Sequence, residues 1–305
     1  KKMETSLKSV FITAALSLFV GCSDQSQQDS DQSDTRALTL VNNFTESFSA
    51  NWASKNAEAM GNLYAEDAVR IVSIRQTPVY GKEAITAQFE GDFDGAFETT
   101  KIESVPSLAK FLSPDLVLAT GTFSVTDAEG KTINQGYWGN AFKLQGSSLT
   151  MLMESAGDSA PNGMRRASLE TPEMPDQMYE GPGANLVKGG VDAYVLNTNT
   201  ANPNGIADLF TQNGIQAVSN NDRILFGRDS ILETLKQNPA TEIKLDAWPY
   251  GYREIGNSIA IGWGGYRQTD PSGAVVEFGQ WGNIWEVTET GLKIVIERAS
   301  AFSGE

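Results

Sequence analysis

One unit of sequence occurs twice in the 305-residue chain, and this repeat constrains the fold more than any other feature. Three pairs of segments lie 146 residues apart: Leu63-Tyr64 and Leu209-Phe210, Gly81-Lys82 and Gly227-Arg228, and Ile85 and Ile231. Later segments, 136–142 and 149–156, recur at 143 residues. A unit of about 120 residues that occurs only twice predicts two tandem domains, not a solenoid.

The stretch between the two copies has the composition of a linker. Residues 158–183 contain four prolines among Gly and Ser, and such a sequence interrupts helices and strands alike. We therefore expect a first domain at 36–157, a linker at 158–183 and a second domain at 184–303.

Within each copy, apolar residues at helical spacing come first, and apolar and polar residues that alternate as in strands follow. Leu38, Val41, Phe44, Phe48 and Trp52 keep a spacing of three to four residues, which predicts a helix with one apolar face. Shorter helices fit 56–63 and 82–89, and the remainder alternates as strands separated by Gly-containing turns. In the second copy, residues 202–205 favour a turn in place of the second helix. Helices followed by a run of hairpins predict an α+β fold.

The N-terminus has the pattern of an export signal. Lys1, Lys2 and Lys8 precede an apolar run from Val10 to Val20, which is too short to span a membrane as a permanent helix. The ending Leu18-Phe19-Val20-Gly21-Cys22 resembles a bacterial lipobox, so residues 1–21 are interpreted as a lipoprotein signal peptide and Cys22 as the lipidated residue. An ordinary signal peptide with an incidental cysteine is the alternative.

Lipidation at Cys22 predicts attachment to a membrane through lipid alone. Ser23 follows the cysteine, and by resemblance to Gram-negative lipoproteins this favours the periplasmic face of the outer membrane. Residues 22–35 carry no apolar side chain beyond Cys22 and are expected to form a disordered tether.

Composition excludes several classes of function. The chain has no His and one Cys, which excludes Ser-His-Asp triads, HExxH zinc sites, internal disulfides and cysteine zinc sites. We predict no metal and no cofactor. The net charge of −15 disfavours nucleic acid as a partner.

The motifs resemble a known family. Residues 63–69 (LYAEDAV), 78–85 (PVYGKEAI) and Gly121-Thr122-Phe123 are similar to the SnoaL-like branch of the nuclear transport factor 2-like superfamily, and the second copy keeps a weaker version around 209–210 and 226–231. The resemblance implies two cone-shaped α+β domains, each a curved, mainly antiparallel sheet wrapping about three N-terminal helices. Its members include isomerases, cyclases, dehydratases and subunits without activity, and they often dimerise through the sheet, so the two domains are expected to form an intramolecular pseudo-dimer.

Enzymes of this superfamily use a pocket carboxylate as general base. Glu154 and Glu297 are the candidates, because each lies in an apolar final strand at the same position of the repeat. Alternation alone does not say which face of the strand they occupy. A structural carboxylate paired with Arg or with a Trp N–H is the alternative.

Aromatic and amide side chains provide candidates for a ligand pocket: Tyr137, Trp138, Asn140, Trp263, Tyr266, Trp281 and Asn283. The alternative is that these aromatic residues form the core. The sequence therefore favours a cell-envelope lipoprotein that binds a small apolar or amphipathic ligand, or a partner protein of the envelope. A carboxylate-dependent isomerase, cyclase or dehydratase is the second hypothesis, and an assembly module without a cavity is the third.

Overall fold

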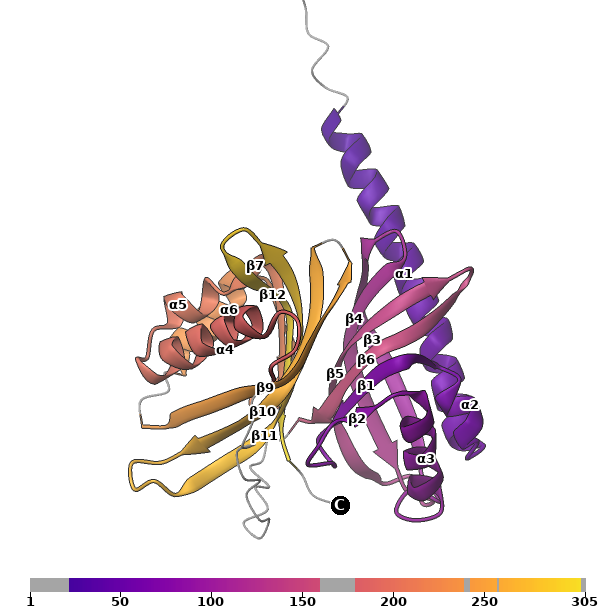
Figure 1. The fold of residues 1–305 in the computed structure, drawn as a ribbon. Helices are drawn as coiled ribbons and strands as arrows, with labels where there is room; N and C mark the ends of the chain where they lie inside the picture. Colours follow the sequence, from indigo (N-terminus) through magenta and orange to yellow (C-terminus); the bar gives the residue numbers. More distant parts are fainter. Residues whose placement is uncertain (1–21, 160–178, 239–241, 257, 303–305) are drawn as a thin grey trace, which may run out of the picture.

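A computed structural model describes residues 22–159, 179–238, 242–256 and 258–302 (Figure 1). It contains two six-stranded sheets, each accompanied by helices, in two domains of the same α+β architecture. The two sheets have the same strand order, and equivalent elements begin 146 or 143 residues apart, except that α1 begins 162 residues before α4. The predicted fold class and its duplication are confirmed.

The first domain has three helices and six strands within the described residues. Its elements are α1 (Cys22–Ala53), α2 (Ala57–Gly61), β1 (Tyr64–Val72), β2 (Val79–Tyr80), α3 (Lys82–Phe93), β3 (Lys101–Ser113), β4 (Leu116–Thr126), β5 (Thr132–Gln145) and β6 (Ser148–Asp158). The strand order is β2-β1-β6-β5-β4-β3. Only the β1–β6 pair is parallel, so the sheet is mainly antiparallel.

The second domain repeats this order. Its elements are α4 (Ala184–Asn199), α5 (Pro203–Ala207), β7 (Phe210–Val218), β8 (Leu225–Phe226), α6 (Arg228–Gln237), β9 (Lys244–Gly256), β10 (Ile259–Thr269), β11 (Val275–Thr288) and β12 (Gly291–Ala301). The strand order is β8-β7-β12-β11-β10-β9, and β7 pairs in parallel with β12.

Helix α1 begins earlier than predicted. It starts at Cys22, so residues 22–35, expected to be a disordered tether, are helical. The packed half of α1, with Ala37, Val41 and Phe44 buried, already forms helical turns, and each residue added before it contributes one more backbone hydrogen bond. The polar start of α1 projects beyond the sheet (Figure 1), where it needs no apolar partner. The predicted signal peptide and most of the predicted linker lie outside the described residues.

Three strands of each sheet were not predicted: β1, β2 and β3 in the first and β7, β8 and β9 in the second. β1 and β7 lie between helices and are buried along most of their second half, so they lack the alternation of a one-sided strand. β3 carries Pro106 and is largely half-exposed at the sheet edge, where proline is tolerated. The turn predicted at 202–205 is instead the start of α5, because Pro203 takes the first helical position and the Asn202 side chain accepts from Gly205 N at 3.0 Å.

The two sheets face each other across the middle of the molecule, and most of the helices lie on the outer flanks (Figure 1). One buried apolar cluster contains side chains of both sheets, among them Leu118, Met153, Ile261 and Ile296. Close approach occurs at equivalent glycines: a Cβ on Gly139 would lie 2.8 Å from Ile296 Cδ1, and one on Gly282 would lie 2.8 Å from the Ser155 side chain.

Polar contacts border this apolar cluster. Arg298 Nε donates to Tyr137 O at 2.9 Å, Trp263 Nε1 donates to Tyr80 Oη at 3.1 Å, and Arg253 forms an ion pair with Asp67. Each contact joins one domain to the other. Such sheet-to-sheet packing is the geometry a pseudo-dimer requires, and pairing in solution stays a prediction.

Candidate functional site

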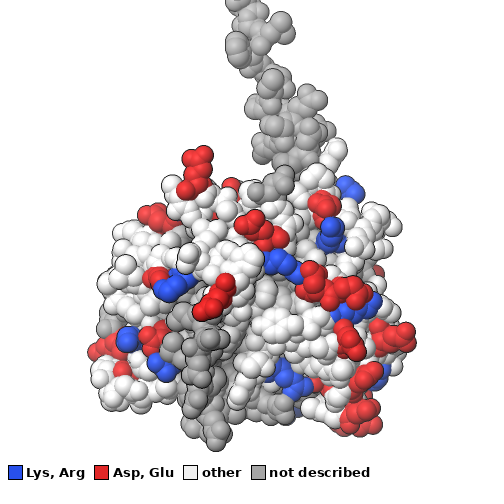
Figure 2. Space-filling model, in the orientation of Figure 1, with Lys and Arg blue, Asp and Glu red and all other residues white. Residues whose placement is uncertain are grey.

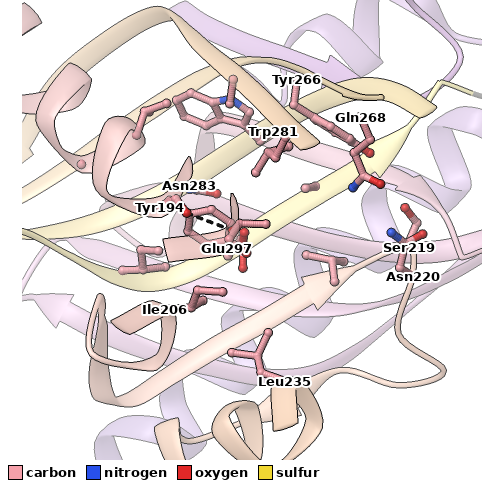
Figure 3. Close-up of a pocket in the computed structure, with 18 of the residues that line it drawn as sticks. Tyr194, Ile206, Ser219, Asn220, Leu235, Tyr266, Gln268, Trp281, Asn283 and Glu297 are labelled. Atoms are coloured by element: carbon pink, nitrogen blue, oxygen red, sulfur yellow. Dashed lines mark hydrogen bonds between the residues drawn. The ribbon is translucent and has the colours of Figure 1, made fainter. Parts of the chain in front are cut away.

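Each domain has a cavity between its helices and the inner face of its sheet. The cavity of the first domain measures about 80 Å³ and that of the second about 210 Å³. The larger one is drawn in Figure 3, with side chains from α4, α5, α6 and the sheet pointing into it. The second domain therefore has the larger of the two cavities.

The difference in volume follows from substitutions between equivalent helices. In the first domain, aromatic rings fill the space under the sheet: Phe44 lies 4.9 Å from Phe142 between ring centroids, and Trp52 lies 6.3 Å from Phe89. The residues 146 positions later are smaller or more polar. Phe44, Phe48, Trp52 and Phe89 correspond to Gly190, Tyr194, Thr198 and Leu235. Removing aromatic volume without refilling it leaves a void.

A β-bulge directs both candidate glutamates inward. In β6, Met151 faces the helices, whereas the next two residues, Leu152 and Met153, both belong to the core between the sheets. The pairing register with β5 shifts at this point. The bulge inverts the alternation, so Glu154 faces the cavity, and the same shift in β12 sends Glu297 inward.

Glu154 belongs to a charged network. Its Oε2 accepts from Tyr64 Oη at 2.5 Å and from Arg70 Nε at 2.8 Å. Arg70 also lies 3.7 Å from Asp92, and its guanidinium stacks on the Phe89 ring at 4.4 Å from the centroid. Arg70 and Glu154 are 4% and 6% exposed, so this is a buried, compensated carboxylate.

Glu297 has neutral partners instead. Gln216 Nε2 donates to Glu297 Oε2 at 2.8 Å, and Tyr194 forms a hydrogen bond with the same carboxyl group (Figure 3). Gln216 stands where the first domain has Arg70, and Phe210 stands where it has Tyr64. Burial raises the pKa of Glu297, while the hydrogen bonds from Gln216 and Tyr194 oppose that rise.

A second carboxylate lines the larger cavity. Glu277 of β11 is 7% exposed and accepts from Tyr266 Oη at 3.0 Å. Burial, followed by the charge of Glu277, raises the pKa of Tyr266 well above its ordinary value, so this phenol stays protonated. The first domain has Asn134 at the position of Glu277. None of the described residues that line the larger cavity is Lys or Arg.

Five of the seven residues predicted to form a ligand pocket line a cavity. Trp138 and Asn140 line the first, and Tyr266, Trp281 and Asn283 line the second. Their polar groups are largely engaged by the sheet itself: Trp281 Nε1 donates to Gly265 O at 3.2 Å, and Asn283 Oδ1 accepts from Arg298 N at 3.3 Å. These side chains therefore form the walls of the cavities and contribute few free hydrogen-bond donors to a ligand.

Tyr137 and Trp263 were predicted to line a pocket, and the structure places both between the sheets. Tyr137 is adjacent to Trp138 and Trp263 lies three residues before Tyr266, so each points to the opposite face of its strand. Tyr137 Oη donates to Asn221 O at 3.3 Å across the domain boundary.

Sequence reasoning missed Arg70, Tyr194, Gln216 and Glu277. Three of them could have been found by comparing equivalent positions of the two copies. Arg70 and Gln216 occupy one position of the repeat, and Glu277 replaces Asn134. Tyr194 replaces Phe48 and brings a hydroxyl group beside Glu297.

The described part of the chain contains neither a cluster of metal-ligating side chains nor a membrane-spanning helix. There, His, Cys, Asp and Glu form no group of three or more suited to a metal ion. No helix in the same residues is long and apolar enough to cross a membrane. On the face shown in Figure 2, acidic and basic side chains are interspersed. Lipidation of Cys22, the first residue of α1, stays a prediction.

Residues 40–137 match the family model of the nuclear transport factor 2 (NTF2) domain. This span covers most of the first domain, whose strand order the second domain repeats. The chain thus contains tandem domains of NTF2-like fold. Assignment to the SnoaL-like branch stays a prediction.

The chain shows low similarity to several solved structures. A domain of unknown function with a cystatin-like fold from Nostoc punctiforme is 16% identical, with a TM-score of 0.36 over 39% of this chain and 75% of that one. A ketosteroid isomerase-like protein from Erwinia carotovora is 14% identical, with a TM-score of 0.34 over 40% and 98%. An NTF2-like protein from Novosphingobium aromaticivorans is 15% identical, with a TM-score of 0.36 over 50% and 99%. The search of curated proteins found no match. We infer no activity from these similarities.

Proposed function

We propose that the second domain binds a small apolar or amphipathic ligand in its cavity, and that the first domain serves as its structural partner. The observation that carries this proposal is the cavity of about 210 Å³, walled by apolar and aromatic side chains and supplied with a few polar groups. Such a combination is typical of small-molecule sites. The first domain keeps the fold and fills the equivalent space with aromatic rings.

Filling the cavity with the first domain's residue tests this proposal. Thr198→Trp places in α4 the ring that Trp52 supplies in α1, and it should abolish ligand binding because the ring occupies the space. The matched control is Leu196→Trp on the same helix, where the side chain is 63% exposed and does not line the cavity. A thermal-shift screen of small hydrophobic compounds on both variants and the unmodified protein provides the readout. Ligands that bind Thr198→Trp as well as the control would disprove the proposal.

The buried carboxylate of Glu297 supports a second candidate function. A carboxylate with a raised pKa beside a phenol donor is suited to moving a proton at a bound carbonyl compound, as in isomerases and dehydratases. In this hypothesis Glu297 accepts the proton and Tyr194 donates a hydrogen bond. Glu154 is less suited, because Arg70 compensates its charge. Glu297→Gln should then abolish turnover while binding persists, and turnover by that variant would exclude the role.

We also propose that the protein is held at the cell envelope by lipid on Cys22, as its lipobox-like sequence favours. Cys22→Ser should release the protein from membranes. Unchanged membrane fractionation of that variant would contradict lipid attachment, and a membrane partner protein would then be the alternative.

A further inference from the structure

One end of the larger cavity is polar, and the matching end of the smaller cavity is mostly apolar. Four residues that line the larger cavity correspond to four that line the smaller one: Asn220, Tyr266, Gln268 and Glu277 replace Ile74, Phe123, Val125 and Asn134. Three of these replacements add a polar group where the first domain has hydrocarbon. Polar groups in an apolar cavity cost free energy unless they form hydrogen bonds, so this end is suited to a ligand with a polar group.

The four polar side chains of this end are neighbours. Glu277 Oε1 accepts from Tyr266 Oη at 3.0 Å and from Asn220 Nδ2 at 3.5 Å. Gln268 of β10 pairs directly with Glu277 of β11, so the two side chains lie next to each other on the inner face of the sheet. In Figure 3, Gln268 lies at the same end of the cavity as Ser219 and Asn220.

Two side-chain amides at this end can bond to a ligand. The hydrogen bond to Glu277 uses Nδ2 of Asn220 and leaves its Oδ1 as an acceptor. The half-buried amide of Gln268 bonds to no other side chain among the described residues. An amide offers both a donor and an acceptor, and a hydroxyl group likewise donates and accepts. The two amides therefore match a head group with hydroxyls.

The rest of the cavity is suited to an apolar group. Trp281 and Trp285 line it, with ring centroids 5.7 Å apart, and Ile206, Leu235 and Ile294 add apolar walls. A cavity of about 150 Å³ can hold benzene, so the volume of about 210 Å³ leaves space for one ring with a short chain.

The charges of the lining favour an uncharged head group. None of the described residues that line the cavity is Lys or Arg, so a carboxylate or phosphate would lose its hydration without meeting an opposite charge. Glu297 already has partners within the protein, because it accepts from Gln216 and bonds to Tyr194. Hydroxyl groups need no counter-charge.

We propose that the second domain binds an uncharged amphipathic molecule, whose adjacent hydroxyl groups bond to Asn220 and Gln268 and whose apolar part lies against Trp281. The inference rests on the proposed binding function and specifies its ligand class. It makes the two amides the residues that select the head group.

Three compounds with the same number of non-hydrogen atoms test the inference: 3-phenylpropane-1,2-diol, 4-phenylbutan-1-ol and 3-phenylpropionate. Their affinities for the full-length protein are measured by calorimetry at neutral pH. The diol should bind more tightly than the monoalcohol although it is less hydrophobic, because each of its hydroxyl groups meets an amide. The carboxylate should bind most weakly.

Two variants remove one amide each and keep most of its volume. Asn220→Leu and Gln268→Leu should each weaken binding of the diol about tenfold, the loss expected when a hydroxyl is left without its partner. The monoalcohol, which bonds to one amide at most, should lose less, and its retained binding shows that the variant is folded with its cavity intact. The matched control is Gln212→Leu in β7, an exposed residue that does not line the cavity.

The outcomes separate this inference from the proposed binding function. Diol binding by both variants as tight as by the control would overturn the role of the amides and leave the apolar-ligand proposal standing. Tightest binding of the carboxylate would overturn the uncharged head group alone. No binding by any of the compounds at millimolar concentration would contradict the binding function itself.

Discussion

The two domains place a glutamate at the same point of the same bulged strand and surround it differently. Glu154 lies against an arginine in a cone filled with aromatic rings, whereas Glu297 lies against an amide and a phenol in a cone with an open cavity. Backbone, bulge and burial are shared. The comparison shows that a few side chains decide whether this fold has a compensated core or an acidic cavity.

Replacing each glutamate by glutamine should give the largest difference in stability between the two domains. Glu154→Gln leaves the buried Arg70 without its main partner and should reduce the free energy of unfolding by about 3 to 5 kcal/mol. Glu297→Gln removes a charge that has no cationic partner among the described lining residues, and it should change that free energy by about 1 kcal/mol or less. Urea unfolding followed by circular dichroism measures both.

The control for Glu154→Gln is Glu58→Gln in α2, an acidic residue of the same domain outside both cavities, which should leave stability nearly unchanged. Equal losses for Glu154→Gln and Glu297→Gln would contradict the distinction between the two domains.

Substitutions at the two equivalent glycines between the sheets test the sheet-to-sheet packing, to which both domains contribute. Gly139→Val and Gly282→Val each force a branched side chain against the other sheet, and each should cost about 1 to 3 kcal/mol through overpacking. Thermal unfolding and small-angle X-ray scattering together report stability and domain separation. Gly91→Ala in α3 is the control, because a Cβ there meets nothing within 4 Å. Variants as stable and compact as this control would be incompatible with sheet-to-sheet packing.

The pH dependence of stability gives the smallest effect. Burial raises the pKa of Glu297 above its ordinary value of 4.5, so the folded state holds this proton more tightly than the unfolded state. Its contribution is therefore fully present below about pH 4.5 and is lost as the pH rises through the folded pKa, at up to about 1.4 kcal/mol per pH unit. Relative to Glu297→Gln, the unmodified protein should become less stable over this interval.

The phenols Tyr194 and Tyr266 keep their protons throughout that range, because burial raises the pKa of each well above 10. A stability difference between the two proteins that is independent of pH would show that Glu297 does not titrate on folding as proposed.

Sequence patterns could predict the repeat, the helices and the fold class. The apolar spacing of α1 is a local pattern, and the repeated motifs recur at a constant distance along the chain. They could not predict the orientation of Glu154 or Glu297. Strict alternation from Leu149 and Met151 would send Glu154 to the outer face, and only the bulge at Leu152 reverses it. A bulge adds one residue without a marked sequence pattern.

The identity of the partners was equally hidden. Arg70 and Glu154 lie 84 residues apart in the chain and become neighbours only because β1 pairs in parallel with β6. Cavity volume has the same origin, since the loss of a ring at Thr198 matters only once α4 lies over the sheet. Tyr137 and Trp263 lie between the sheets for a simpler reason, because each is an odd number of residues from a side chain that lines a cavity, Trp138 or Tyr266.

The glycine contacts between the sheets have an evolutionary consequence. In a dimer of identical subunits, one gene encodes both cones, so any mutation that hollows one also hollows the other and destabilises the assembly twice. Here both halves of the interface belong to one chain, and each half mutates independently. One domain can therefore keep a rigid interior with a compensated charge while the cavity of the other changes by mutation. Each chain then carries one variable cavity and one constant structural domain.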